Sequence, residues 1–246
     1  MKSILITGVS SGIGYELSKL YLEKGYIVCG LSRRSPGQLI SHPNMVFTAC
    51  DLQCLDQVEE VVTTMLHQIN HAPLEIVFLN AGKFGDPPQR ADETSITHLQ
   101  DVLCLNLLAA KAVLDACLKR AVVHPKSVVF SSSISAIRQR AGMLSYSVSK
   151  AALNALAKTY QIENPDIFFA LLGLCNVDTH LASIILQADK RFEELYALRA
   201  RASRLGYMVN AFDRARQIAL ILEQRDRLNL KSGEFREVRD LIPMLS

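Results

Sequence analysis

The chain has 246 residues, of which 49% are hydrophobic and 21% are charged. This length and composition fit a globular domain with a large core and exclude a disordered chain. The formal net charge is only +3, and the basic residues are scattered, which excludes an extended nucleic-acid-binding surface.

Short apolar runs alternate with helical patterns along the chain. Strands are expected at residues 4–6, 27–31, 45–47, 76–79, 127–130 and 167–172, with a closing strand at 233–238. Helices are expected at about 13–21, 55–69, 95–120, 145–160 and 211–222. The alternation predicts a single α/β domain over residues 1–246, with a doubly wound parallel sheet that carries helices on both faces. Ligands of such sheets bind at the carboxyl ends of the strands.

Residues 180–206 break the alternation and are expected to form a lid over the carboxyl edge of the sheet. Their apolar side chains could line a substrate pocket, but the buried face of a lid helix is the better interpretation for most of them. These side chains are Leu181, Ile184, Ile185, Leu186, Phe192, Leu195 and Tyr196. The arginines of the segment are expected in solvent, although they could meet an acidic substrate: Arg199, Arg201 and Arg204.

A glycine-rich turn, Thr7-Gly8-Val9-Ser10-Ser11-Gly12-Ile13-Gly14, follows the first strand and opens the first helix. Glycines let backbone N–H groups approach a pyrophosphate, and a helix N-terminus favours its negative charge. The spacing differs from the common Gly-x-Gly-x-x-Gly fingerprint, so a tight turn without a ligand stays an alternative. The cofactor contacts expected here are Gly8, Ser10, Ser11, Gly12, Ile13 and Gly14.

Ser32 and Arg33 follow the second strand, where an enzyme that prefers NAD usually has an acidic residue. A hydroxyl beside a guanidinium would bind the 2′-phosphate of NADPH, which a carboxylate would repel. The sequence therefore predicts NADPH as the cofactor, with Ser32 and Arg33 as contacts. Arg34 is as well explained by a solvated loop.

Tyr146 and Lys150 are four residues apart at the start of a helix, which puts them on one face. A nearby ammonium lowers the pKa of a phenol, so the pair could act as a general acid toward a carbonyl. Ser133 ends the fifth strand, where its hydroxyl could stabilise the developing charge on the carbonyl oxygen. A surface helix pair and a strand end are the alternatives for these residues.

These motifs together resemble the short-chain dehydrogenase/reductase family, in its single-domain branch with a Rossmann-type NAD(P)-binding fold. Ser133 stands thirteen residues before Tyr146, which is the family's usual spacing. The resemblance implies that Ser133, Tyr146, Lys150 and Asn106 are catalytic, with Asn106 holding a water in a proton relay to Lys150. It also implies cofactor contacts from Tyr146 and Lys150 and from two further motifs: Asp51-Leu52 beside the adenine, and Asn80-Ala81-Gly82 after the fourth strand.

One segment departs from the family pattern. Leu174-Cys175 stands where the family usually has Pro-Gly, before a threonine that meets the nicotinamide amide. Val177 and Thr179 fit as cofactor contacts, although the loop could follow a different path. Within the family, the start Leu31-Ser32-Arg33 and the ending Gly233-Glu234-Phe235 look most similar to the sepiapterin reductase-like and benzil reductase-like branches.

The resemblance implies an NADPH-dependent carbonyl reductase that converts a ketone to an alcohol. The apolar side chains of residues 180–206 suggest that this ketone is apolar or aromatic. The first alternative is a reductase of 3-oxoacyl thioesters on acyl-carrier protein, and the second is a non-catalytic NADPH sensor. The resemblance also implies a homodimer or homotetramer packed through the helices that carry Asn106 and Tyr146.

Neither a membrane segment nor a metal site is expected. The apolar run near the N-terminus is too short for a signal peptide, and no stretch is long enough to cross a bilayer, so a cytoplasmic location is predicted. The six cysteines form no Cys-x-x-Cys pair and have no histidine at ligand spacing. Cys29, Cys104 and Cys117 are expected to be small core residues.

Overall fold

The computed structural model describes residues 1–69, 72–120 and 124–245. Its centre is a parallel sheet of seven strands in the order β3-β2-β1-β4-β5-β6-β7. The strands are β1 (Ser3–Thr7), β2 (Ile27–Ser32), β3 (Met45–Ala49), β4 (Leu74–Leu79), β5 (Ser127–Ser132), β6 (Phe168–Gly173) and β7 (Phe235–Glu237). The chain runs outward from β1 through β2 to β3 and then crosses back to β4 on the other side of β1, so the sheet is doubly wound as predicted.

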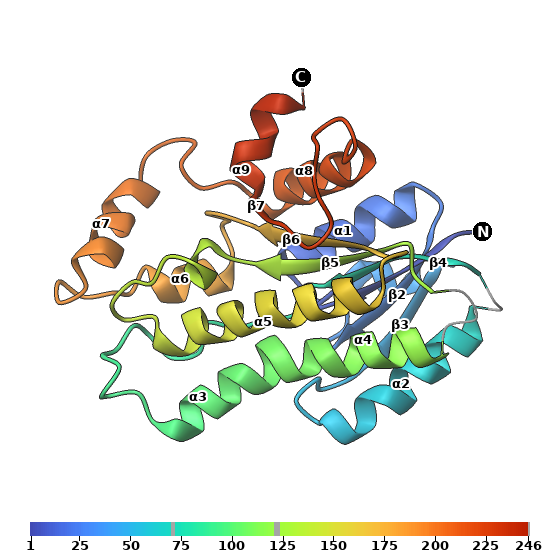
Figure 1. Ribbon diagram of the computed structural model, residues 1–246, viewed down its shortest axis with the longest axis horizontal. Coiled ribbons are helices and arrows are strands. Elements are labelled where there is room, and N and C mark those ends of the chain that lie inside the picture. Colours follow the sequence, from blue (N-terminus) through green and yellow to red (C-terminus); the bar gives the residue numbers. More distant parts are fainter. Residues whose placement is uncertain (70–71, 121–123, 246) are drawn as a thin grey trace.

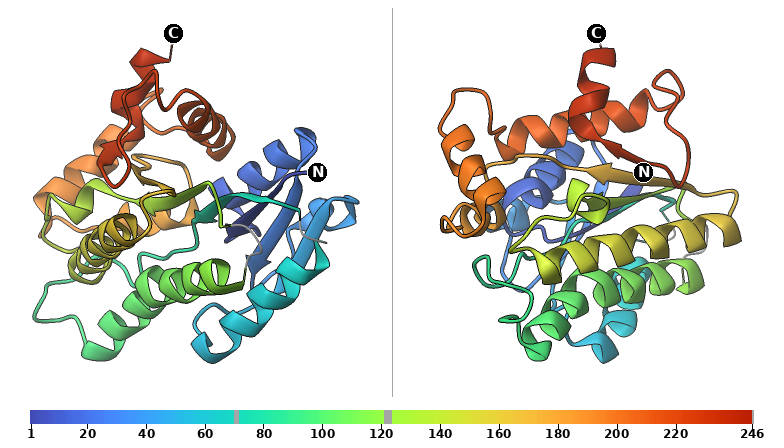
Figure 2. Two further views of the ribbon diagram at one scale, coloured as in Figure 1. Left: turned by 45° about the vertical axis from the view of Figure 1, so that its right-hand side comes forward. Right: turned by 60° about the vertical axis from the view of Figure 1, so that its left-hand side comes forward.

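Helices cover both faces of the sheet (Figures 1 and 2). The α-helices are α1 (Gly12–Glu23), α2 (Leu55–Gln68), α3 (Ile96–Leu103), α4 (Ala109–Arg120), α5 (Leu144–Glu163), α6 (His180–Ile185), α7 (Glu193–Ala202), α8 (Ala211–Glu223) and α9 (Val238–Leu241). Short helices of other types lie at Gly37–Ser41, Cys104–Leu108, Ile134–Ala136 and Ile242–Met244.

Two hydrophobic cores fill the layers between sheet and helices. One core joins the sheet to α2, α4 and α5 on one face, and its fully buried members include Val62, Leu114 and Leu153. The other joins the opposite face to α1, α8 and α9. Strands buried on both faces explain the nearly continuous apolar runs of the sequence.

Several element boundaries differ from the predictions. The expected helix 95–120 contains a π-helical segment, Cys104–Leu108, which the apolar pattern does not reveal because it continues through that segment. Strand β5 continues to Ser132 because its backbone pairs with Gly173 beyond the apolar run. The closing strand is only Phe235–Glu237, since Val238 already begins α9. The helix that begins near Ser145 runs three residues further than predicted, to Glu163.

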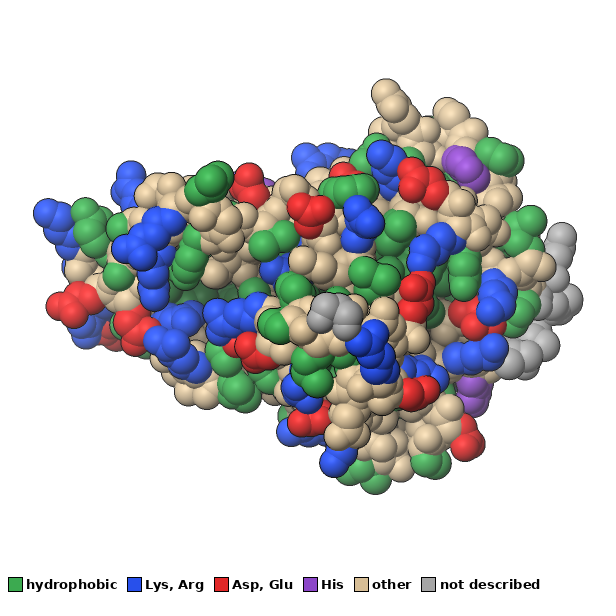
Figure 3. Space-filling model, turned by 90° about the horizontal axis from the view of Figure 1, so that it is seen from above, with side chains coloured by type: hydrophobic (Ala, Val, Ile, Leu, Met, Phe, Trp, Pro, Cys, Tyr) green, Lys and Arg blue, Asp and Glu red, His purple; other side chains and the backbone are tan. Residues whose placement is uncertain are grey.

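Charged side chains of both signs are mixed over the face seen in Figure 3, without a continuous basic surface on that face. Among the described residues, no helix is long and apolar enough to cross a bilayer. Nor do these residues contain a group of three or more His, Cys, Asp or Glu side chains suited to a metal ion.

Candidate active site

The carboxyl ends of β1, β4 and β5 are held together by Asn80. The Thr7 hydroxyl oxygen accepts hydrogen bonds from the backbone N–H groups of Asn80 and Ala81, both at 2.9 Å. The Asn80 side chain donates to the Thr7 carbonyl at 3.1 Å and accepts from the Ser131 hydroxyl at 3.2 Å. The predicted Asn80-Ala81-Gly82 motif therefore lies at the switch point of the sheet, where ligands of such folds bind.

The glycine-rich turn lies beside this point and requires its glycines. Gly8 has a φ of +80° and Gly12 a φ of +58°, in the left-handed region. A Cβ on Gly14 would lie 2.2 Å from the Gly8 carbonyl oxygen, so the first turn of α1 packs directly on the loop. Ser11 precedes α1 without capping it through its side chain, which leaves the first N–H groups of the helix free of a side-chain acceptor. The free N–H groups at the N-terminus of α1 can donate hydrogen bonds to a phosphate group.

Ser32 and Arg33 lie at the end of β2, next to Asp51. The Arg33 guanidinium is 70% exposed and lies 4.0 Å from the Asp51 carboxylate. The Ser32 hydroxyl is buried and donates to the Arg34 carbonyl oxygen at 2.7 Å. Arg33 is thus free to turn toward an anion in solvent, whereas the Ser32 hydroxyl already has an internal acceptor. Leu52, the other predicted adenine contact, is buried.

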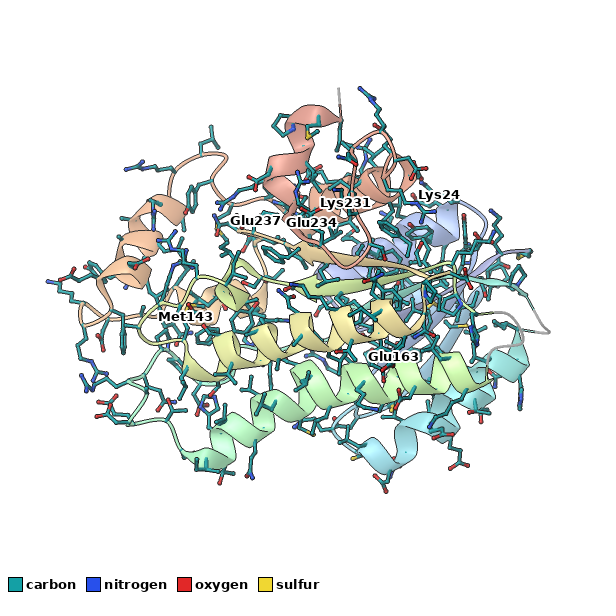
Figure 4. All side chains as sticks on the ribbon, viewed as in Figure 1. Lys24, Met143, Glu163, Lys231, Glu234 and Glu237 are labelled. Carbon is teal, nitrogen blue, oxygen red and sulfur yellow. The ribbon has the colours of Figure 1, made fainter. Side chains whose placement is uncertain are left out.

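Tyr146 and Lys150 lie on the buried side of α5, whose two ends are marked by Met143 and Glu163 in Figure 4. The Lys150 Nζ lies 5.6 Å from the centre of the Tyr146 ring and donates to the Ser131 carbonyl oxygen at 2.7 Å. Ser133 follows β5, and its hydroxyl lies near enough to that of Tyr146 to favour the phenolate and oppose the rise of the Tyr146 pKa. The structure therefore brings the predicted tyrosine, lysine and serine together.

Burial governs the proton affinity of both groups. It raises the pKa of Tyr146 to about 12, against the opposing effect of the Ser133 hydroxyl. It lowers the pKa of Lys150 to about 8, because the charged ammonium loses its hydration. At neutral pH the phenol is therefore protonated and able to donate, beside an amine that exchanges protons readily.

Asn106 lies within the π-helical segment and is 1% exposed. Its side chain accepts from the Lys83 N–H at 2.8 Å, and donates to the Lys83 carbonyl at 2.9 Å and to the Ser149 hydroxyl at 3.0 Å. Ser149 in turn donates to the Tyr146 carbonyl at 2.8 Å. The network ties Asn106 to the first turn of α5, and a Cβ on Gly82 would lie 3.2 Å from the Asn106 Oδ1.

The loop after β6 keeps a backbone feature that is typical of glycine. Cys175 has a φ of +61°, in the left-handed region, at the position where the family usually has Gly. Val177 is buried and forms a single parallel bridge with Val209. Thr179 caps α6 and lies beside the glycine-rich turn, because a Cβ on Gly12 would be 3.5 Å from its methyl group. Thr179 therefore lies beside the glycine-rich turn despite the Leu174-Cys175 departure, and contacts of Val177 and Thr179 with a cofactor stay a prediction.

The lid packs an apolar cluster over Tyr146, which is only 7% exposed. The cluster joins the phenol ring to Phe84, Met143, Ala188, Phe192 and Leu195, with Leu181, Ile184 and Ile185 packed against it. Tyr196 lies outside it and is exposed, as are Arg199, Arg201 and Arg204. Buried lid faces therefore account for most of the apolar residues between 180 and 206.

Sequence reasoning missed Phe84 and Ser149. The Phe84 ring centre lies 5.4 Å from that of Tyr146, but its position in an irregular loop carries no periodic signal. Ser149 contacts two predicted catalytic residues, and its place directly before Lys150 was the available signal. The prediction for Cys104 as a core residue was wrong, because this thiol is partly exposed, whereas Cys29 and Cys117 are buried.

Comparison with known families identifies one match that covers most of the chain. A family model described as short chain dehydrogenase matches residues 2–181. The chain is 31% identical over 198 residues to a benzil reductase ((S)-benzoin forming) from Bacillus subtilis, covering 78% of this chain and 81% of the relative. It is 28% identical over 209 residues to a probable short-chain type dehydrogenase/reductase from Helicobacter pylori, covering 82% and 75% of the two chains.

Solved structures share the fold over nearly the whole chain. A short-chain dehydrogenase/reductase from Saccharomyces cerevisiae superposes with a TM-score of 0.80 at 21% identity, covering all of this chain and 98% of the other. A 3-ketoacyl-(acyl-carrier-protein) reductase from Brucella melitensis, in complex with NADH, superposes with a TM-score of 0.77 at 18% identity and 96% coverage of both. At these identities the similarity concerns the fold alone.

Proposed function

The chain belongs to the short-chain dehydrogenase family, and on that premise we propose that it reduces an apolar or aromatic ketone to an alcohol with NADPH. The observation that carries the proposal is the group of buried Tyr146 and Lys150 with half-buried Ser133, beneath an apolar lid at the carboxyl edge of the sheet. A carbonyl there would meet a proton donor within an apolar enclosure.

The cofactor site is proposed to run along the carboxyl edge. The glycine-rich turn and the N-terminus of α1 hold the pyrophosphate, Asp51 and Leu52 border the adenine, and Arg33 binds the 2′-phosphate. Support for this arrangement comes from the uncapped start of α1 and from the exposure of Arg33. When bound, the nicotinamide supplies the hydride that the carbonyl carbon accepts.

The protein's own part is to hold and move one proton. Ser133 donates a hydrogen bond to the substrate oxygen, and Tyr146 gives up its proton to that oxygen as negative charge develops. The Lys150 ammonium stabilises the resulting phenolate, and its pKa of about 8 suits return of the proton from solvent at neutral pH. Asn106 positions Tyr146 through Ser149, and its role in a water relay remains part of this proposal.

The substrate class is proposed from the walls around the phenol. The side chains packed against Tyr146 are apolar, and two of them, Phe84 and Phe192, are aromatic. The similarity to a benzil reductase supports an aromatic ketone.

We propose further that the chain forms one domain, located in the cytoplasm, and that it assembles into a homodimer or homotetramer through α4 and α5. A monomeric mass in sedimentation equilibrium would reject the assembly.

Turnover by the purified protein tests the proposed function. We expect oxidation of NADPH with aromatic diketones, at a kcat/KM at least tenfold above that with NADH. Arg33→Ala should weaken NADPH binding about 10- to 100-fold and leave NADH binding within twofold, because only a charge-assisted hydrogen bond to the 2′-phosphate is lost. Arg34→Ala is the matched control and should change either affinity far less.

The substrate panel also contains pterins and 3-oxoacyl thioesters. Preference for a 3-oxoacyl thioester would replace the ketone proposal with the acyl-carrier reductase. Tight NADPH binding without turnover of any carbonyl would support the sensor function and reject the enzyme.

A further inference from the structure

Three thiols surround the loop between β3 and α2, close to the proposed adenine contacts. Cys50 follows β3 and is buried, Cys54 precedes the first residue of α2 and is exposed, and Cys104 begins the π-helical segment. The Cys104 Sγ donates to the Gln53 carbonyl oxygen at 3.6 Å. This contact joins two segments that are fifty residues apart in the sequence.

The contact sets an upper limit on the separation of Cys54 and Cys104. In a trans peptide a carbonyl oxygen lies about 2.8 Å from the next Cα. The Cys104 Sγ therefore lies no more than about 6.4 Å from the Cα of Cys54. Since a Sγ lies about 2.8 Å from its own Cα, the Cα atoms of Cys54 and Cys104 are at most about 9.2 Å apart, whereas disulfides join Cα atoms about 4.4–6.8 Å apart. At this limit the bond requires one segment to move toward the other. A charge on Cys54 also raises the pKa of Cys104, after the larger effects of burial and Asp101.

The two segments differ in how firmly they are held. The π-helical segment contains Asn106, whose side chain has three hydrogen bonds and is almost completely buried. The other segment is a surface turn, closed by the Cys54 N–H on the Asp51 carbonyl at 2.9 Å and by the Gln53 N–H on the Asp51 carboxylate at 3.1 Å. Its side-chain ties to the neighbouring elements are the partly exposed hydrogen bonds of Gln53 with Asp101 at 2.6 Å and Lys83 at 3.1 Å. A bond between the segments would therefore move the turn, with Asp51 and Leu52, rather than Asn106.

We propose that Cys54 and Cys104 form a reversible disulfide that displaces the Asp51–Cys54 turn and weakens binding of the adenosine end of the cofactor. This inference rests on the proposed function for the identity of the cofactor. Because Asn106 stays in place, the chemical step at saturating cofactor is unaffected.

The oxidant is a small disulfide, R–S–S–R. The exposed Cys54 thiolate attacks one of its sulfurs and expels R–S⁻, which leaves a mixed disulfide on Cys54. The Cys104 thiolate then attacks the Cys54 sulfur and expels the second R–S⁻. The protein loses two electrons and two protons, and the small disulfide becomes two molecules of R–SH. A dithiol reductant reverses the reaction.

The full-length protein is incubated in reduced or oxidised glutathione, and its peptides are mapped by mass spectrometry without reduction. We expect a Cys54–Cys104 linkage with a loss of two hydrogens. The cross-link closes a loop of about fifty residues, which predicts a melting temperature about 5–15 °C higher. NADPH affinity, followed by its fluorescence, should fall about tenfold, with kcat within twofold. Dithiothreitol should reverse every change.

Matched variants separate the proposal from general oxidation. Cys54→Ser and Cys104→Ser should each abolish all the effects, whereas Cys50→Ser and Cys175→Ser should keep them. No linkage, a Cys50–Cys54 linkage, or a Cys54–Cys104 linkage with unchanged NADPH affinity would each overturn the proposal. The peptide map and the melting temperature are read without turnover, so they decide the disulfide even where the proposed reductase activity fails.

Discussion

Lys150 is a buried cation that serves the proposed proton transfer and lowers the stability of the fold. It is 3% exposed, and its ammonium donates to the Ser131 carbonyl oxygen at 2.7 Å, while no carboxylate among the described residues forms an ion pair with it. Burial lowers its pKa from 10.5 to about 8, so the folded protein binds this proton less tightly than the unfolded chain. The charged form therefore destabilises the fold below about pH 8, and the effect disappears as the pH rises from about 8 to 10.5.

Replacement of Lys150 tests this cost directly. At 1.36 kcal/mol per pKa unit, the shift means that the buried charge lowers the free energy of unfolding by about 3 kcal/mol. Replacing Lys150 removes this cost but also loses the hydrogen bond to Ser131, which contributes about 1 kcal/mol. We expect Lys150→Met to raise the free energy of unfolding by about 2 kcal/mol at pH 7, measured by urea denaturation, and to lose the gain by pH 10. Turnover should fall at least a hundredfold. Lys158→Met, on the exposed side of the same helix, is the control and should change neither quantity. A destabilised Lys150→Met protein at pH 7 would contradict the account.

Individual residues were predictable from the sequence where a motif carries its own chemistry. Ser133, Tyr146 and Lys150 were chosen from their order and spacing, and the structure brings them together. Phe84 and Ser149 were not chosen, because their importance comes from packing against residues distant in the sequence. The internal bond of the Ser32 hydroxyl to the Arg34 carbonyl was likewise invisible, since it depends on the local path of the chain after β2.

At the scale of elements, ion pairs hold the beginning of α7 to the loop after β5 and to the loop before α3. Glu194 receives hydrogen bonds from Arg138 at 2.7 Å and Arg140 at 3.2 Å, in the loop after β5. Arg191, just before α7, pairs with Glu93 at 2.9 Å, in the loop that leads to α3. These ion pairs lie at the surface, so each adds little to stability and is weakened by salt.

Removing the ion pairs of Glu194 should make closure of the lid less favourable and leave Tyr146 unchanged. Glu194→Gln is expected to raise the KM for the ketone about two- to fivefold, with kcat within twofold, because the closed lid loses its two surface ion pairs with Arg138 and Arg140. Glu193→Gln is the control, since Glu193 lies in the same turn and forms no ion pair with a described residue. Steady-state kinetics at low and at high salt provide the check. A fall in kcat with unchanged KM would contradict a lid that acts through closure.

Element types were more predictable than element ends. Apolar runs identified the six longer strands, but hydrogen bonding within the sheet extended β5 to Ser132 and α9 shortened β7. The π-helical segment could not be predicted, because its apolar residues continue the helical pattern while its hydrogen bonds change. The lid was recognised as an exception to the alternation, but its division into α6 and α7 was not.

At the scale of the whole molecule, the doubly wound sheet gathers motifs from across the chain at one edge. Residues 7–14, 80–82, 133 and 146–150 come from separate strand and helix ends, and all lie at the carboxyl side of β1, β4 and β5. This convergence follows from strand order and right-handed crossovers, which is why the fold class and the side of the site were predictable together. The shape of the substrate pocket was not, since it depends on how the lid packs on Phe84 and Met143.

The central claim is that Tyr146 donates the proton to the substrate carbonyl. Its most direct test is the ketone-dependent oxidation of NADPH by Tyr146→Phe, measured alongside the fluorescence of bound NADPH and the melting temperature. The account predicts at least a hundredfold fall in kcat, with NADPH affinity and stability close to those of the unaltered protein, because only the hydroxyl is removed. A folded Tyr146→Phe protein that binds NADPH and turns over at an unchanged rate would contradict it.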